Sequence, residues 1–213
     1  MDEVKVYKGP GVTVRFNPRR CIHAAECVRG LPAVFDPAAR PWIQPAKATA
    51  DEVLAVVARC PTGALQASGD DGRTAELAVD RNEMHIVADG PHHLRGEIQI
   101  RDASSQVLAH ETRMALCRCG ASKNKPYCDQ SHVSGGFRDE GACAPGEALP
   151  IAAGPLALTL HADGPVQCDG PVAIFDVFGE QVAAVQQAWL CRCGASKNKP
   201  YCDGSHKAID FKA

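Results

Sequence analysis

Two stretches of this 213-residue sequence carry the same spacing of metal-binding residue types, in the pattern C-x-C-x8-C-x3-H. Thiolate and imidazole groups are the ligands that zinc ions and iron–sulfur clusters use in proteins. The two stretches lie 74 residues apart and differ at one position, Gln130 in place of Gly204. Such repetition indicates a metal site that the chain builds twice. The candidate ligands are Cys117, Cys119, Cys128 and His132 in the first copy, and Cys191, Cys193, Cys202 and His206 in the second.

Each copy divides into two pairs of ligands. Cys117 and Cys119 can reach one metal from a tight loop, and Cys128 and His132 share one face if a helical turn connects them. Two pairs suit the two irons of a [2Fe-2S] cluster. A structural zinc ion is the alternative that three cysteines and one histidine permit, but zinc sites usually separate their first two cysteines by two or more residues.

Three further cysteines, Cys21, Cys27 and Cys60, lie in the N-terminal third of the chain. Bacterial ferredoxins bind clusters through C-x2-C-x2-C-x3-C-P runs. Cys21 and Cys27 match the first and third positions, Ala24 replaces the second, and Cys60 with the following proline matches the closing pair. Three cysteines with an empty corner at Ala24 favour a [3Fe-4S] cluster, with [4Fe-4S] as an alternative in which His23 is a candidate fourth ligand. Three buried cysteines in an ordinary small domain are the remaining alternative. Residues 10–70 resemble the single-cluster, divergent ferredoxin-like domains.

Local sequence patterns predict the elements that position these three cysteines. Alternating apolar residues predict a half-buried strand over 12–16 that ends at the Asn17-Pro18 turn. A helix is expected over 49–59, with Thr49 as its N-cap, acidic residues in its first turn and an apolar stripe of four residues. This helix would deliver Cys60, whereas His23 is expected nearer the surface.

From about Glu76 the sequence changes to strand-like runs separated by Asp-Gly and Gly-Pro turns. The 74-residue repeat extends through these runs, since residues 88–91 and 162–165 are both Ala-Asp-Gly-Pro. We therefore expect three domains, at 1–75, 76–145 and 146–213, with the stretch 141–150 as the linker between the two repeats.

The remaining cysteines and histidines lack partners related by the repeat. Cys143 and Cys168 are therefore assigned to structure, with Cys168 behaving as a small hydrophobic residue. Five histidines are expected to be polar surface residues: His85, His92, His93, His110 and His161.

The run CRCGASKNKPYCDGSH at 191–206, with its near-copy at 117–132, resembles the CDGSH (mitoNEET-like) iron–sulfur domain family. The resemblance implies a [2Fe-2S] cluster held by the three cysteines and the histidine of each copy. It also implies a small β-rich domain that pairs about a two-fold axis, with both clusters on one side. Because this chain carries two copies and no anchor, it resembles the soluble tandem members. We expect an α+β protein in which a ferredoxin-like domain precedes two CDGSH domains that form a pseudo-two-fold dimer within one chain.

Residues around the ligands raise three further expectations. If Gly204 has a positive φ, Gln130 costs about 1 kcal/mol at the same place in the first copy. Asp129 and Asp203 are candidates to cap the short helices that hold the histidines. Basic residues in both copies are expected to offset the negative charge of the clusters and to attract an acidic partner; these are Arg118, Lys123, Lys125, Arg192, Lys197 and Lys199.

Composition narrows the class of protein. A net charge of −2 and 5% aromatic residues argue against nucleic-acid and anionic-membrane partners. The absence of a signal-peptide pattern and the odd count of 11 cysteines favour thiol ligands in a reducing compartment over a disulfide scaffold. We expect a monomer that is cytoplasmic and does not enter a membrane.

The histidine ligands decide the expected chemistry. Replacing a thiolate by a neutral imidazole removes negative charge and raises the reduction potential of a cluster. Imidazole is also the ligand most readily protonated near neutral pH, which makes these clusters acid-labile. The sequence therefore predicts electron transfer with a redox partner protein. The alternatives are cluster storage, transfer to an apo-acceptor or redox sensing, with a structural zinc protein less favoured. Because no nucleophile motif or phosphate loop is present, we do not expect an enzyme.

Overall fold

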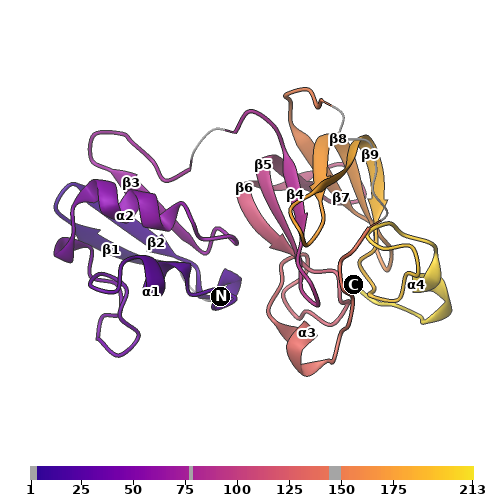
Figure 1. The fold of residues 1–213 in the computed structure, drawn as a ribbon, viewed down its shortest axis with the longest axis horizontal. Coiled ribbons are helices and arrows are strands. Elements are labelled where there is room, and N and C mark those ends of the chain that lie inside the picture. The colour runs from indigo at the N-terminus through magenta and orange to yellow at the C-terminus, as the bar shows by residue number, and fades with distance from the viewer. Residues whose placement is uncertain (1–3, 77–78, 144–149) are drawn as a thin grey trace. The chain divides into compact units, whose positions relative to one another are not determined.

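The structure is a computed structural model that describes residues 4–76, 79–143 and 150–213. The chain divides into two compact units, Met1–Ala78 and Val79–Ala213 (Figure 1). The first unit corresponds to the predicted ferredoxin-like domain, and both predicted CDGSH domains lie together in the second. The predicted boundary at 145/146 and most of the predicted linker fall on residues 144–149, outside the described residues.

The first unit is a three-stranded antiparallel sheet with helix α2 lying along one face (Figure 1). Its strands, in spatial order, are β1 (Lys5–Gly9), β2 (Val12–Phe16) and β3 (Leu65–Gly69). Its helices are α1 (Glu26–Gly30), α2 (Ala50–Val57) and the 3-10 helices η1 (Pro18–Arg20) and η2 (Pro45–Lys47). The predicted strand over 12–16 is therefore confirmed.

The predicted helix before Cys60 is also confirmed. Thr49 is its N-cap and forms a capping box with Glu52: the Glu52 N–H donates to Thr49 Oγ1 (3.3 Å), and the Thr49 N–H donates to Glu52 Oε2 (2.9 Å). Four apolar residues of α2 are buried in the same core as Val12, Val14 and Phe16 of β2; they are Val53, Leu54, Val56 and Val57. The helix therefore carries Cys60 to the end of this core.

The second unit is a six-stranded sheet with two short helices. Its first copy of the repeat contains β4 (Glu83–Ile86), β5 (His92–Arg101), β6 (Val107–Leu116) and α3 (Ser131–Ser134). Its second copy contains β7 (Leu156–Leu160), β8 (Val166–Phe175), β9 (Gln181–Leu190) and α4 (Ser205–Ala208).

The 74-residue repeat of the sequence is also a repeat of structure. β8, β9 and α4 have the bounds of β5, β6 and α3 shifted by 74 residues. Both long hairpins change register at the equivalent point, next to Gly96 in β5 and Gly170 in β8. Both glycines have positive φ, and a Cβ atom would lie 2.0 Å from Asn82 Oδ1 at Gly96 and 2.2 Å from the Pro155 carbonyl oxygen at Gly170. No side chain fits at either bulge.

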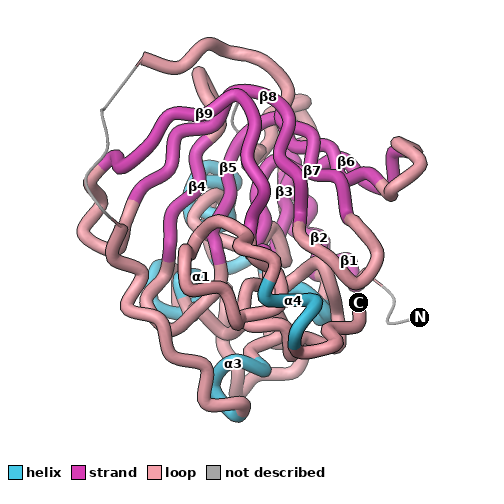
Figure 2. Tube along the Cα trace, turned by 90° about the vertical axis from the view of Figure 1, so that its right-hand side faces the viewer, coloured by secondary structure: helices cyan, strands magenta, loops and turns pink. Residues whose placement is uncertain are grey.

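Strand pairing joins the two copies. β4 pairs antiparallel with β5 of its own copy and parallel with β8 of the other. β7 likewise pairs antiparallel with β8 and parallel with β5. One core cluster contains buried residues from both copies, among them Ile98, Leu158 and Ile174. The segments that carry α3 and α4 consequently lie at the same end of the sheet (Figure 2).

The expectation that His92 is a surface residue is wrong. Its side chain is completely buried at the start of β5, where inward-facing and outward-facing residues alternate. Burial disfavours the imidazolium form and lowers the pKa of His92 to about 3. The second copy has Val166 at the equivalent position, also buried. The inward face of the strand, and not the polarity of histidine, decides its position.

Within the described part of the chain, every helix is too short or too polar to cross a lipid bilayer.

Candidate metal centres

The structure brings together the four predicted ligands of each copy as two pairs. In the first copy the sulfur atoms of Cys117 and Cys119 lie 3.7 Å apart, and Cys128 Sγ lies 3.5 Å from His132 Nδ1. The second copy repeats this geometry, with 3.7 Å between Cys191 Sγ and Cys193 Sγ and 3.4 Å between Cys202 Sγ and His206 Nδ1. Among the described residues, no three His, Cys, Asp or Glu side chains lie close enough together to hold a single metal ion.

Backbone hydrogen bonds fold each ligand loop back onto the strand that precedes it. In the first copy the Cys117 N–H donates to the Pro126 carbonyl and the Cys128 N–H donates to the Ala115 carbonyl, both at 2.8 Å. The Ser122 hydroxyl donates to the Tyr127 carbonyl at 2.7 Å. The third cysteine is thereby held beside the first, although they are separated by ten residues in the sequence. The second copy contains the same bonds 74 residues later.

The turn before each short helix differs in detail from the prediction. Helix α3 begins at Ser131, so Cys128 precedes the helix and does not share a helical face with His132. The N-cap is Gln130, and Asp129, one residue earlier, accepts hydrogen bonds from the N–H groups of Ser131 (3.0 Å) and Lys123 (2.8 Å). The aspartate thus fixes the turn without being the cap itself.

In both copies, a residue in the left-handed backbone conformation directs its N–H group towards the third cysteine. Gln130 has φ 69° and Gly204 has φ 87°, as expected for the glycine of the motif. Their N–H groups donate to Cys128 Sγ and Cys202 Sγ, each at 3.4 Å. Such bonds favour a negatively charged sulfur ligand. No atom lies within 4 Å of a Cβ built on Gly204, so the turn in the second copy also has room for a side chain.

The two ligand loops touch each other through glycines. A Cβ atom on Gly120 would lie 2.5 Å from the Cys193 carbonyl oxygen, and a Cβ on Gly194 would lie 2.6 Å from the Cys119 carbonyl oxygen. Both glycines have positive φ, 80° and 83°. The glycine of each loop therefore contacts the backbone of a candidate ligand residue in the other loop.

An arginine between the first two cysteines of each copy is buried. Arg118 donates to the carbonyls of Val87 (2.6 Å) and Gly90 (2.7 Å), and Arg192 donates to the equivalent His161 (2.8 Å) and Gly164 (3.0 Å). Buried side chains of this kind tie the ligand loop to the preceding turn and do not face a partner protein. The lysine at the end of each basic run also has a local role, since Lys125 Nζ donates to the Ser122 carbonyl at 2.7 Å.

The first unit gathers its three cysteines from three different segments. Cys21 follows η1, Cys27 lies in α1, and Cys60 follows α2. All three line one small cavity together with Ala24, which occupies the predicted empty corner. The Arg29 guanidinium donates to the Ala24 carbonyl at 2.8 Å and so holds the loop between the first two cysteines. His23 is exposed and has a φ of 51°.

A larger open pocket of about 810 Å³ lies beside two of these cysteines, Cys21 and Cys27. Cys21, His23 and Cys27 lie in its wall. The rest of the lining is mostly aromatic or aliphatic, with two basic residues and no acidic one: Lys5, Tyr7, Phe16, Pro18, Ala25, Val28, Pro37, Arg40, Pro41 and Trp42. The N-terminal cysteines are therefore open to a molecule that approaches this pocket.

Comparison with known protein families agrees with this arrangement. Residues 89–133 and 163–207 both match the family described as "Iron-binding zinc finger CDGSH type". Residues 7–70 match the family described as "Divergent 4Fe-4S mono-cluster". The chain belongs to the CDGSH iron–sulfur family, with an N-terminal divergent mono-cluster domain.

Relatives are also found for the mono-cluster domain. The uncharacterized protein YjdI of Escherichia coli strain K12 is 37% identical over 62 residues, which cover 29% of this chain and 82% of YjdI. The YjdI protein of E. coli O157:H7 matches to the same extent. The match lies in the N-terminal region and supports the division between the mono-cluster domain and the CDGSH repeats.

The donor sets fit iron–sulfur clusters. Burial raises the pKa of Cys21 and Cys27, and it raises the pKa of Cys128 to about 11. The hydrogen bond between the paired thiols raises the pKa of Cys117 and lowers that of Cys119 to about 6. Most of these thiols are therefore protonated at neutral pH without metal, so cluster binding must release protons.

Two cysteines outside the CDGSH and mono-cluster ligand sets take the expected structural roles. Cys168 is fully buried in the core of the CDGSH unit, and Cys143 packs partly buried against that core. Sequence reasoning missed the contact between the two CDGSH loops. Its signal was the glycine after the second cysteine of each copy, because glycine is required where backbones approach closely.

We predict that Gly120→Ala destabilises the CDGSH unit more than Gly204→Ala does. Both substitutions place a side chain at positive φ, which costs about 1–2 kcal/mol. At Gly120 the new Cβ must also push the two loops apart, which adds about 1–3 kcal/mol. Thermal unfolding of both variants measures this difference, and equal losses in Tm would show that the loops are not in contact.

Proposed function

We propose that this chain is a multi-cluster electron-transfer protein, with a [2Fe-2S] cluster in each CDGSH loop and a [3Fe-4S] cluster in the mono-cluster domain. The main support is the backbone contact between the CDGSH loops, in which Gly120 lies against Cys193 and Gly194 lies against Cys119. Two redox centres held by touching loops are well placed to exchange an electron. The proposed role is that of a carrier and not of an enzyme.

The pairing of ligands supports two irons in each CDGSH loop. The two sulfurs at 3.7 Å form one pair, and the cysteine and histidine at 3.5 Å form the other. A [2Fe-2S] cluster takes two ligands on each iron, as in Rieske centres. Electrons supplied by a redox partner would enter such a site at a higher potential than in an all-cysteine site, because imidazole is neutral.

The corner at Ala24 supports a three-iron cluster in the mono-cluster domain. Three thiols share the cavity with this alanine, whose side chain has no ligand atom. A [4Fe-4S] cluster is the alternative, and it needs a fourth ligand such as exposed His23 or a solvent molecule. The pocket beside Cys21 and Cys27 has Lys5 and Arg40 in its wall and no acidic residue, which supports docking of an acidic redox partner.

The pairing of strands from one copy with strands of the other supports an intramolecular pseudo-two-fold dimer within a monomeric chain. Each short strand, β4 or β7, lies between β5 and β8, and the ligand loops meet through equivalent glycines. None of the eleven cysteines forms a disulfide, which agrees with the proposed location in a reducing compartment such as the cytoplasm.

A second candidate function is delivery of clusters to an apo-acceptor, or redox sensing through cluster loss. The observation that favours it is the partial exposure of His132 and His206, each in the first turn of a short helix. Water and protons can reach these ligands, and a protonated imidazole cannot bind iron.

Metal analysis tests the proposed cofactors. Anaerobically purified protein is expected to contain about seven irons and eight sulfides per chain, from two [2Fe-2S] clusters and one [3Fe-4S] cluster. EPR of the oxidised protein is expected to show a three-iron signal. A count of about eight irons would indicate a [4Fe-4S] cluster in the mono-cluster domain in place of [3Fe-4S]. Stoichiometric zinc without sulfide would refute the whole assignment.

Electron transfer and cluster transfer are separated by one pair of experiments. We expect a ferredoxin reductase or dithionite to reduce the protein, and air to restore the full visible absorbance over repeated cycles. Incubation with an apo-ferredoxin measures the alternative by the cluster absorbance that the acceptor gains. Rapid transfer combined with bleaching on the first reduction would favour the delivery function instead.

His206→Cys is expected to slow acid loss of the second CDGSH cluster and to lower its reduction potential. Thiolates bound to ferric iron resist protonation to lower pH than imidazole does. Absorbance decay at about pH 6 measures the effect, and the first CDGSH site of the same molecule is the internal control. If the absorbance of the variant decays as fast as that of the wild type at both sites, protonation of the histidine is not the mechanism of cluster release.

A further inference from the structure

The open pocket of the mono-cluster domain has the size and the lining of a small-molecule site. Its volume of about 810 Å³ falls within the range of roughly 300–1,000 Å³ that is usual for ligand pockets. Such pockets are mostly apolar, with a few polar groups that fix the orientation of the ligand. The lining follows this pattern, since apolar residues surround the polar side chains of Lys5, Tyr7, His23 and Arg40.

This pocket lies outside the space that the three candidate cluster ligands share. Cys21, Cys27 and Cys60 together line the small cavity that contains Ala24. Of these three thiols, only Cys21 and Cys27 also line the open pocket. A molecule in the pocket would therefore lie beside the candidate cluster site without taking the place of the cluster.

The end of the sheet forms one wall of the pocket. β1 and β2 pair antiparallel, with Lys5 opposite Phe16. Residues directly opposite in such a pair, and residues two apart on one strand, point to the same face of a sheet. Lys5, Tyr7 and Phe16 therefore share a face, and Phe16 is buried in the core there with Tyr7 packed against that core. An ammonium group and a phenol are thus placed beside an apolar aromatic surface.

The loop over residues 36–42 forms another wall and is held in place by its own hydrogen bonds. The Asp36 N–H donates to the Trp42 carbonyl at 2.9 Å. The Arg40 guanidinium donates to two carbonyls of the same loop, at 2.8 Å and 2.7 Å. Such pre-organisation reduces the ordering cost of binding a ligand.

Two aromatic rings from these walls meet at nearly a right angle. Phe16 and Trp42 have ring centroids 5.0 Å apart and an interplanar angle of 79°. Aromatic rings attract one another in stacked and in edge-to-face arrangements. A corner of this kind suits a flat ring, which can stack on one aromatic side chain and meet the edge of the other.

The charges of the described lining are positive. Lys5 and Arg40 are basic, and none of the lining residues is acidic. Two acidic residues lie near the lining in the sequence, but they are bonded elsewhere: Glu26 pairs with Arg29 at 2.5 Å, and Asp36 accepts from the Ala38 N–H at 2.9 Å. The pocket therefore favours an anion over a neutral or cationic ligand.

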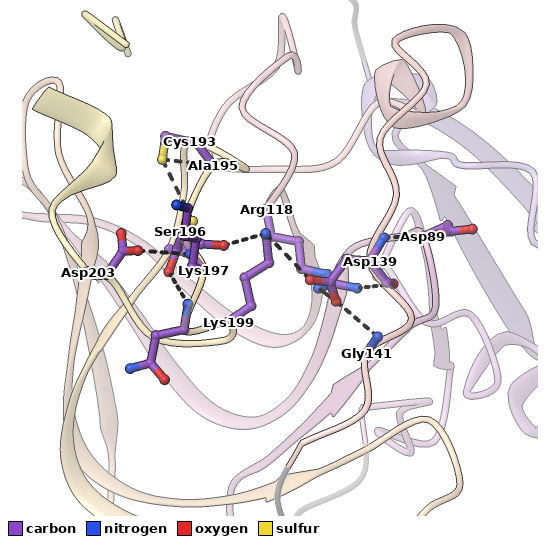
Figure 3. A network of polar contacts seen from close by, with 12 residues as sticks. Asp89, Arg118, Asp139, Gly141, Cys193, Ala195, Ser196, Lys197, Lys199 and Asp203 are labelled. Atoms are coloured by element: carbon purple, nitrogen blue, oxygen red, sulfur yellow. Dashed lines mark hydrogen bonds and ion pairs between the residues drawn. The ribbon is translucent and has the colours of Figure 1, made fainter. Parts of the chain in front are cut away.

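The polar side chains of the pocket also differ from those of the CDGSH loops in having no internal partner. Within residues 4–76, 79–143 and 150–213, the side chains of Lys5 and His23 make no hydrogen bond or ion pair. In the CDGSH unit, by contrast, Asp139 pairs with Arg118 at 2.6 Å and lies 3.5 Å from Lys199. Figure 3 shows how that network uses its charged groups internally. Those of the pocket remain available to a ligand.

We propose that this pocket binds a small planar aromatic anion. Its conjugated ring lies against Phe16 and Trp42, and its single acidic group is bound by the cations of the wall, Lys5 and Arg40. The class is defined by this combination of a flat ring with one carboxylate, sulfonate or phosphate. The proposal does not depend on the electron-transfer function, because it concerns binding alone.

Isothermal titration calorimetry of the anaerobically purified full chain tests the pocket with three probes. Naphthalene-2-sulfonate has both the ring and the charge, naphthalene-2-sulfonamide has the ring alone, and cyclohexanesulfonate has the charge alone. Naphthalene-2-sulfonate is expected to bind at one site, and at least about threefold more tightly than either of the other probes. Hexaglutamate is the fourth titrant and represents an acidic segment of a protein.

Two pairs of variants locate the site. Lys5→Gln is expected to weaken the binding of naphthalene-2-sulfonate by about two- to fivefold. Lys8→Gln is its control, because Lys8 is exposed on the opposite face of the same strand, and it should leave the affinity unchanged. Trp42→Leu should weaken binding by about threefold or more, whereas Trp189→Leu in the CDGSH unit should not.

The outcome does not rest on the buried part of the pocket, because Lys5 is exposed and Lys5→Gln leaves the core intact. The proposal is overturned if naphthalene-2-sulfonate does not bind, if cyclohexanesulfonate binds as tightly, or if Lys5→Gln and Lys8→Gln have the same affinity. Tighter binding of hexaglutamate than of naphthalene-2-sulfonate also overturns it and would assign the pocket to an acidic partner protein. None of these titrations reduces a cluster, so the electron-transfer function is tested separately.

Discussion

The close approach of the two CDGSH loops is the constraint on which the structure of the CDGSH unit depends. Gly120 and Gly194 face carbonyl oxygens of Cys193 and Cys119 at distances that no side chain allows. Each loop is consequently shaped by the other as well as by its own hydrogen bonds. Ligand geometry in one copy cannot change freely without disturbing a ligand residue of the other.

This constraint explains why so much of each loop is internally bonded. Ser122, Asp129 and the buried Arg118 use their polar groups on neighbouring backbone, which leaves the loop few ways to relax. A rigid loop holds sulfur and imidazole ligands in place before metal arrives, which reduces the ordering cost of binding. The short helices add little rigidity, since each is only four residues long.

Much of this arrangement could be predicted from the sequence because it is local or repeated. The strand at 12–16, the capped helix before Cys60 and the close approach of the first two cysteines in each CDGSH copy all follow from spacing and residue type. The left-handed turn at Gln130 followed from the glycine at the same place in the other copy. These features depend on residues close together in the chain, or on comparison of one copy with the other.

Features that depend on distant segments could not be predicted in this way. His92 is polar and follows a turn, yet the inward face of β5 buries it. The parallel pairing of β4 with β8 and of β5 with β7 leaves no periodic signal, because the partners lie on different copies. The burial of Arg118 was equally hidden, since a basic residue between two ligands suggests charge compensation at a surface.

The pairing of strands between the two copies also affects how the CDGSH unit assembles when the protein is present at low concentration. A site built from two separate chains forms only when the chains meet, so its occupancy falls with dilution. Here β4 and β8, and likewise β5 and β7, belong to one polypeptide, and their encounter is governed by an effective local concentration. The paired loops can therefore form in a cell that contains only a few copies of the protein.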